Sequence, residues 1–132
     1  MKIRVEEYIC QDGTNPYKSW FDGLDPQAAA KIVTAKLRLE LGNTSSVKWF
    51  EGIREYVIDW GSGYRVYLAK DGDALIILLG GGIKRGQQKD IDRAKALHLE
   101  YKLRRGVSRQ ALKRLLAKKT LSATSKIEKG KR

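Results

Sequence analysis

The chain has 132 residues, a net charge of +12 and a hydrophobic content of 42%, which together suit one globular domain. Residues 1–101 hold 15 Lys and Arg against 14 Asp and Glu, a balance of +1, whereas residues 102–132 hold 12 against one, a balance of +11. The single cysteine, Cys10, excludes an intramolecular disulfide, and the longest apolar run, 74–79, is too short to span a bilayer. We therefore expect a cytoplasmic protein with no signal peptide, no membrane contact, no metal site and no cofactor.

The first 42 residues predict one strand and two helices. Apolar residues alternate over 2–10, as in a strand. Pro16 suits the first turn of a short helix that runs to Leu24. Asp25 is then a natural N-cap for a helix over 27–41, which Gly42 ends. The apolar residues of this second helix recur at helical spacing, and we expect them to be buried: Ala29, Ile32, Val33, Leu37 and Leu41.

The middle of the chain switches to strand patterns after a predicted loop over 43–52. Strands are predicted over 53–60, 64–70 and 74–79, with the glycine run 80–82 ending the last strand. Turn signals separate the strands at Gly61-Ser62-Gly63 and Asp71-Gly72. A final helix is predicted over 87–104.

These elements predict an α+β fold in the order β-α-α-β-β-β-α, with a small, mostly antiparallel sheet and helices packed on one side. The domain covers residues 1–104, and a basic extension covers 105–132. Within the extension we expect a short amphipathic helix over 107–121 and a disordered end over 122–132.

The region between Gly42 and Leu97 resembles the RelE/ParE superfamily of toxins from type II toxin–antitoxin modules, and within it the addiction module killer proteins near HigB. The shared positions are Gly42-Asn43, Val47-Lys48, Gly52, Glu55, Ile58-Asp59, Gly61, Gly63 to Tyr67, Leu79, Gly81-Gly82, Lys84, Gln87, Asp90-Ile91 and Ala94-Lys95. Upstream, the pattern of Pro16, Trp20, Leu24 and Asp25 also fits. The resemblance implies the fold order given above, and it implies inhibition of translation by cleavage of mRNA on the ribosome. It further implies neutralisation by a cognate antitoxin, often a helix-turn-helix protein.

RNA cleavage by a 2′-hydroxyl needs a proton acceptor, a group that stabilises the charged phosphorane and help for the leaving oxygen. His98 is the only histidine, so a paired-histidine mechanism is excluded. We expect Arg65 and Lys84 to bind the phosphate and either Lys48 or Glu55 to act as the base. Strand alternation places Arg65 on one face with Tyr67, and Glu55 on a face of the preceding strand. The simpler interpretation is a surface ion pair between Arg65 and Glu55.

Three further residues are candidates for binding substrate. Tyr67 is expected to stack on a base, and Gln87 to position the substrate. Members of the superfamily usually carry an Arg where this chain has Val57 and an Asp where it has Ile83. Arg85 is expected to compensate for the missing cation at Val57, whereas strand alternation puts Arg54 on the opposite face from Glu55. Two other readings of the sequence are rejected. The run 80–82 lacks the ending of a phosphate-binding loop, and Cys10 is expected to be a buried small hydrophobe.

The basic extension predicts backbone contacts to ribosomal RNA. The expected accessory residues are Arg104, Arg105, Arg109, Lys113 and Arg114. The extension could instead be a solvated end without a partner. A third option is that the stripe of Leu112, Leu115 and Leu116 docks on the domain or on an antitoxin.

Two other functions remain open at this point. One is a non-enzymatic, ParE-like toxin that binds DNA gyrase. The other is a degenerate member that serves only as an antitoxin-binding regulatory module. The group of Lys48, Arg65 and Lys84 favours the nuclease, whereas the missing cation at Val57 favours the alternatives.

Overall fold

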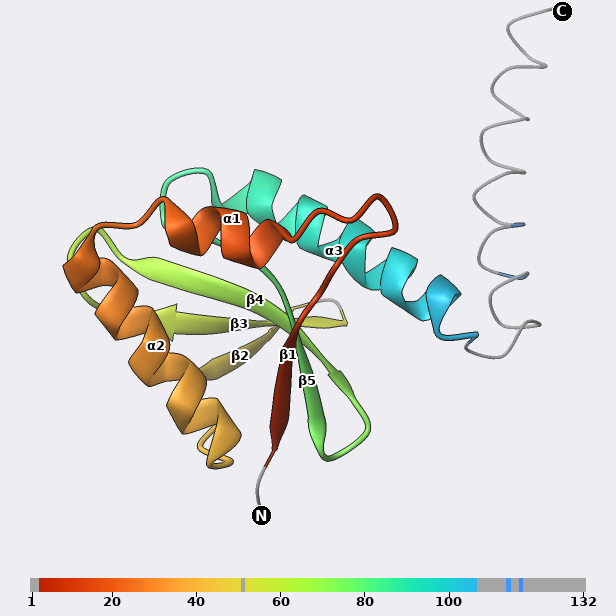
Figure 1. Ribbon diagram of the computed structural model, residues 1–132, viewed down its shortest axis with the longest axis horizontal. Helices are drawn as coiled ribbons and strands as arrows, with labels where there is room; N and C mark the ends of the chain where they lie inside the picture. The colour runs from red at the N-terminus through yellow and green to blue at the C-terminus, as the bar shows by residue number, and fades with distance from the viewer. Residues whose placement is uncertain (1–2, 51, 107–113, 115–116, 118–132) are drawn as a thin grey trace, which may run out of the picture. The chain divides into compact units, whose positions relative to one another are not determined.

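The computed structural model describes residues 3–50, 52–106, 114 and 117 (Figure 1). By its internal contacts the chain divides into two compact units, residues 1–100 and 101–132. Among the described residues there are three helices and five strands, and no helix is long and apolar enough to cross a membrane. The structure thus confirms the α+β class.

The N-terminal part of the chain forms β1 (Arg4–Glu7), α1 (Pro16–Asp22) and α2 (Pro26–Glu40). Each helix begins at a proline that follows a capping side chain. Asn15 Oδ1 accepts a hydrogen bond from Lys18 N–H at 2.9 Å, and Asp25 Oδ1 accepts one from Ala28 N–H at 2.9 Å. The predicted cap of the second helix is therefore confirmed.

The remaining strands are β2 (Val47–Phe50), β3 (Ile53–Ile58), β4 (Tyr64–Asp71) and β5 (Leu75–Ile83), followed by α3 (Gln87–Arg104). They form one sheet in the order β1-β5-β4-β3-β2. All neighbours are antiparallel except β1, which pairs in parallel with β5 at the sheet edge.

Two strand expectations are wrong. The predicted loop over 43–52 contains β2, which pairs with β3. The glycine run 80–82 does not end the last strand, because β5 continues through it and pairs with β4 as far as Ile83. The ladder between β4 and β5 is irregular at Tyr67, where Leu79 is the extra residue on β5.

The helices cover both faces of the sheet, which corrects the expectation that they pack on one side. Neighbouring residues of a strand point to opposite faces. In β5 a side chain at Gly81 would meet Trp20 of α1, whereas one at Gly82 would meet Asp90 of α3. The physical reason is that β5 is buried from Ile76 to Leu79 and requires cover on both faces.

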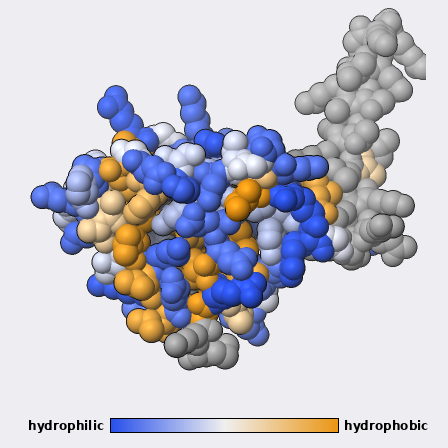
Figure 2. Space-filling view, viewed as in Figure 1, coloured by the Kyte–Doolittle hydropathy of each residue, from blue (hydrophilic) through white to orange (hydrophobic). Residues whose placement is uncertain are grey.

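The main core lies between the sheet and the first two helices. Its buried members are Tyr17, Ile32, Ala35, Leu39, Tyr56, Val66, Leu68, Ile76 and Leu78. The expected buried face of α2 is only partly right, since Val33, Leu37 and Leu41 are 47%, 54% and 72% exposed. Figure 2 shows apolar surface on the side of the molecule over α2. The helix instead buries a stripe that is rotated from the expected one, made of Ala28, Ile32, Ala35 and Leu39.

Candidate functional site

An ion pair between Glu55 and Arg65 lies at the centre of the sheet face beneath α3. Arg65 Nε donates to Glu55 Oε1 at 2.9 Å, and the two side chains are only 13% and 6% exposed, respectively. Strand alternation explains the contact, because Arg65 is paired with Val57 and Glu55 is the next residue on the same face of β3. The expected juxtaposition is confirmed, but the pair is buried rather than at the surface.

Gln87 completes this group from the first residue of α3. Its Nε2 donates to Glu55 Oε2 at 2.9 Å, so both oxygens of the Glu55 carboxylate accept hydrogen bonds. The close approach of α3 depends on Gly82, where any side chain would collide with Asp90. We call Glu55, Arg65 and Gln87 the ion-pair cluster.

The geometry of the ion-pair cluster separates the roles of its members. Glu55 has both oxygens occupied, which favours holding Arg65 in place over accepting a proton. The terminal nitrogens of Arg65 make no hydrogen bond to any residue that the structure describes, so they are available to an anion. A guanidinium fixed through Nε presents its remaining donors in one orientation.

The other predicted cations lie on exposed positions near this face. Lys48 is paired with Glu55 across β2 and β3, and residues in register share a sheet face. Lys84 and Arg85 follow β5 directly and are exposed, and Lys84 N–H donates to the Gly63 carbonyl at 3.2 Å. None of the three makes an ion pair within the described residues.

The burial of Tyr67 disagrees with the role expected for its ring. Its ring is only 1% exposed, so the expected stacking of the ring on a base is corrected. Its hydroxyl is buried and has no hydrogen-bond partner among the described residues. Burial raises the pKa of this phenol, and the nearby carboxylates of Glu55 and Asp90 raise the pKa further.

Two positions differ from the pattern that the sequence resemblance led us to expect, and they pair with neighbouring residues of β4, Val57 with Arg65 and Ile83 with Tyr64. Val57 is half-buried and faces Arg65 across the ladder, and Ile83 is 37% exposed at the end of β5. Arg54 does not replace the missing cation, since it is paired with Leu68 on the opposite face. Desolvation lowers the pKa of Arg54.

The accessory cations belong to the second unit. Arg104, Arg105 and Arg114 are exposed, and Arg114 is helical. Arg109 and Lys113 lie outside the described residues, as do most of the predicted helix over 107–121 and all of 122–132.

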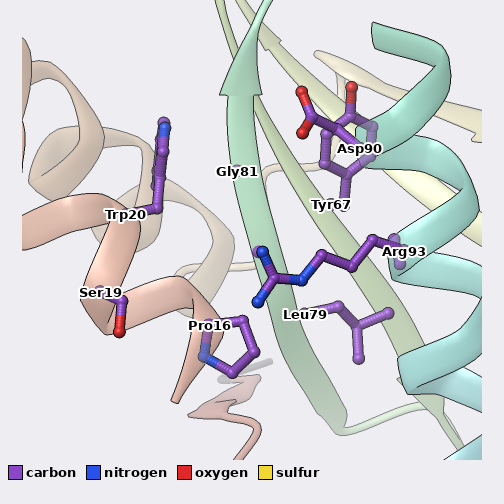
Figure 3. Close-up of a pocket in the computed structure, with 10 residues that line it drawn as sticks. Pro16, Ser19, Trp20, Tyr67, Leu79, Gly81, Asp90 and Arg93 are labelled. Carbon is purple, nitrogen blue, oxygen red and sulfur yellow. The ribbon is translucent and has the colours of Figure 1, made fainter. Parts of the chain in front are cut away.

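A cleft of about 360 Å³ opens beside the ion-pair cluster, between α1 and α3 (Figure 3). It is lined by Pro16, Ser19, Trp20, Tyr67, Leu79, Gly80, Gly81, Asp90, Arg93 and Ala94. We call it the β5-edge cleft. Of its polar residues, the sequence analysis proposed Tyr67 as a binding residue, counted Asp90 only among the positions of the family resemblance, and did not single out Arg93. The glycine run was the available signal, because it marks a close backbone approach.

The described residues contain no group of three or more His, Cys, Asp or Glu side chains arranged to hold a metal ion.

No protein-family model matches the chain. Over 92 residues the chain is 45% identical to an uncharacterized protein of Haemophilus influenzae (strain ATCC 51907 / DSM 11121 / KW20 / Rd). The alignment covers 68% of this chain and 93% of that protein. The chain belongs to the family of this Haemophilus protein. The shared sequence takes in nearly all of the relative, and it leaves about a third of this chain without a counterpart.

Proposed function

We propose that this protein is the toxin of a type II toxin–antitoxin module and inhibits translation by cleaving mRNA on the ribosome. The observation that carries the proposal is the ion-pair cluster. A guanidinium is held rigidly at the centre of the sheet face, with its terminal nitrogens unused by the described residues. The resemblance to the RelE/ParE superfamily supplies the reaction class that such a group serves.

The reaction is attack of a ribose 2′-hydroxyl on the adjacent phosphate. Arg65 stabilises the charge that develops on the phosphorane, since preorganised donors at developing charge give one of the largest catalytic effects. Glu55 and Gln87 hold Arg65 in position. Lys48 is a better candidate for the base than Glu55, because both oxygens of the Glu55 carboxylate already accept hydrogen bonds. Lys84 is assigned to the phosphate, next to the departing 5′-oxygen.

The partners in this proposal are the ribosome, mRNA and a cognate antitoxin of the helix-turn-helix type. The exposed cations of the second unit, Arg104, Arg105 and Arg114, would contact the ribosomal RNA backbone. Such contacts raise affinity without reading sequence.

One observation favours a second candidate, a non-enzymatic toxin or regulatory module. Val57 is the ladder partner of Arg65 on the same face, and RelE/ParE proteins usually carry a cation at this position. A protein of this kind would bind DNA gyrase or only its antitoxin.

The test is induced expression followed by mapping of mRNA ends and of DNA double-strand breaks. Codon-phased mRNA cuts support the proposal, and DNA breaks without cuts support gyrase poisoning. The sharpest variant is Arg65→Lys, which keeps the charge but loses the fork, and it should reduce cleavage by about 10²-fold. Arg4→Lys is the matched control, because Arg4 forms an exposed ion pair of the same length. Full toxicity of Arg65→Lys would reject the assigned role of Arg65.

A further inference from the structure

The β5-edge cleft exists because β1 is shorter than β5. The last backbone bond between the N-terminal segment and β5 runs from Tyr8 N–H to the Leu78 carbonyl at 2.9 Å. From Leu79 onward no described strand pairs along this edge. Gly80 adds no side chain, and an added Cβ there would meet nothing within 4 Å. The cleft is therefore open space over a strand edge.

Its two walls come from different faces of the sheet. Figure 3 shows Trp20 on the α1 side, while Asp90 and Arg93 come from α3, with Arg93 reaching across β5 toward α1. Trp20 packs against Gly81, where any side chain would collide with the indole. The indole therefore has a fixed place at the wall.

Three polar side chains at the cleft make no side-chain hydrogen bond within the part of the chain that the structure describes. The Tyr67 hydroxyl is buried without a hydrogen bond. The Asp90 carboxylate accepts no hydrogen bond, and Arg93 forms no ion pair short enough to be a salt bridge. Burial raises the pKa of Asp90, and the charge of Arg93 opposes this only in part. Buried polar groups are normally paired, so the buried and unpaired Tyr67 hydroxyl indicates a ligand in this cavity. The partly buried Asp90 and the exposed Arg93 also line the cavity, where such a ligand would contact them.

The chemistry of these groups defines that ligand. A carboxylate accepts two parallel hydrogen bonds, and a guanidinium donates two. Guanine presents adjacent N1–H and N2–H donors on one edge and the O6 and N7 acceptors beside them. A base taken out of a stack is read by hydrogen bonds to its edge and by contact with aromatic side chains. The size of the cleft, about 360 Å³, lies in the range of small-molecule sites.

We propose that the β5-edge cleft binds a guanine base of single-stranded RNA, with Asp90 accepting from N1–H and N2–H and Arg93 donating to O6 or N7. Trp20 forms the aromatic wall, and the Tyr67 hydroxyl bonds the base or its ribose. This assignment rests on the proposed function for its biological substrate. Tyr67 is the ladder partner of Glu55, so the cleft adjoins the ion-pair cluster and would place a guanine next to the phosphate at Arg65.

The test is a titration of the full chain with guanosine 5′-monophosphate, followed by NMR of the Trp20 indole and the Gly80 and Gly81 amides. We expect shifts at these signals and weaker binding of the adenosine, cytidine, uridine and inosine monophosphates. Inosine is informative because it lacks only the N2 amino group. Asp90→Asn should weaken guanosine monophosphate binding about tenfold or more, since one acceptor becomes a donor.

Two variants keep the test independent of folding. Asp92→Asn is the matched control, because Asp92 is an exposed acid on the same helix, bonded to Gln88 at 2.9 Å and not part of the cleft. Binding should be unchanged in this variant. Gly80→Val fills the cleft from its floor without meeting another atom within 4 Å of the new Cβ, and binding should be lost while circular dichroism stays native.

Equal shifts with all five nucleotides, or binding that Asp90→Asn leaves unchanged, would overturn the guanine assignment. Binding of an extended peptide in place of the nucleotide at the same amides would overturn it as well. The proposed function is tested separately by mRNA end mapping. If the protein binds guanosine monophosphate but mRNA is not cut, the guanine site stands and the proposed nuclease function is rejected. If mRNA is cut without a guanine preference and no nucleotide binds, the guanine site is rejected and the proposed nuclease function stands.

Discussion

Two ion pairs of equal length show how position in the sheet changes what the same chemistry does. Arg4 and Glu6 on β1 are joined at 2.9 Å with side chains 70% and 48% exposed. Arg65 and Glu55 are also joined at 2.9 Å, but their side chains are 13% and 6% exposed. The first pair competes with water and salt, whereas the second is shielded and has a third partner in Gln87. Only the second pair can hold a guanidinium in one orientation.

The largest expected difference is in the free energy of unfolding when the arginine is removed from each pair. Arg65→Ala leaves Glu55 buried without its cation and should lower the free energy of unfolding by about 3–5 kcal/mol. Arg4→Ala should lower it by about 0–1 kcal/mol, because water replaces the lost contact. Urea denaturation of both variants measures the difference, and equal losses would contradict the contrast between the pairs.

The contribution of the third partner comes next. Gln87→Ala removes a hydrogen bond to a buried carboxylate and should cost about 1.5–3 kcal/mol of unfolding free energy. Gln88→Ala is the matched control, since its amide bonds Asp92 at the same distance of 2.9 Å at an exposed site. Thermal denaturation of the two variants should separate them, and a similar shift in Tm would show that Gln87 adds nothing to the pair.

Adjacent glycines test whether the cover around β5 is as close as the structure indicates. Gly81→Ala drives a methyl group into the rigid Trp20 indole and should cost about 1–3 kcal/mol. Gly80→Ala meets open space and should stabilise the fold by about 0.4–1 kcal/mol, through the unfolded chain. Chemical denaturation gives both values, and the same sign for both variants would exclude the described packing.

The smallest effect concerns a carboxylate that lacks the partners of Glu55. Burial raises the pKa of Asp90 above its ordinary value of 3.8, so the folded protein binds the proton more tightly than the unfolded chain. Stability from this group is therefore present at low pH and is lost as the pH rises through the folded pKa. Asp90→Asn should raise Tm slightly at pH 7 and leave it nearly unchanged at pH 3. A lower Tm at pH 7 would contradict this sign.

The features that could be predicted from the sequence are those that strand alternation and helix capping determine. The shared face of Glu55 and Arg65 follows from a period of two, and the start of α2 follows from Asp25 and the proline after it. Strand β2 was missed, because Val47–Phe50 follows a polar stretch and becomes a strand by pairing with β3. The sequence cannot show that pairing directly.

The failures share one cause, which is packing between distant elements. The burial of β5 on both faces decides that α3 crosses to the side opposite α1, and no local pattern in 87–104 contains that information. The bond from Gln87 to Glu55 and the β5-edge cleft both depend on this placement. The exposure of Val33 and Leu37 differs from the expectation because α2 packs through another stripe of the helix, which includes Ile32 and Leu39.

The parallel pairing of β1 with β5 also sets the order in which the protein can be completed during synthesis. Arg4 is the ladder partner of Leu75, so the first strand made waits for the last strand before it has a neighbour. Contacts of such long sequence separation form late and slow folding. The ion-pair cluster needs Gln87, which is made later still. A nascent chain is therefore incomplete at its central face until most of the first unit has been translated.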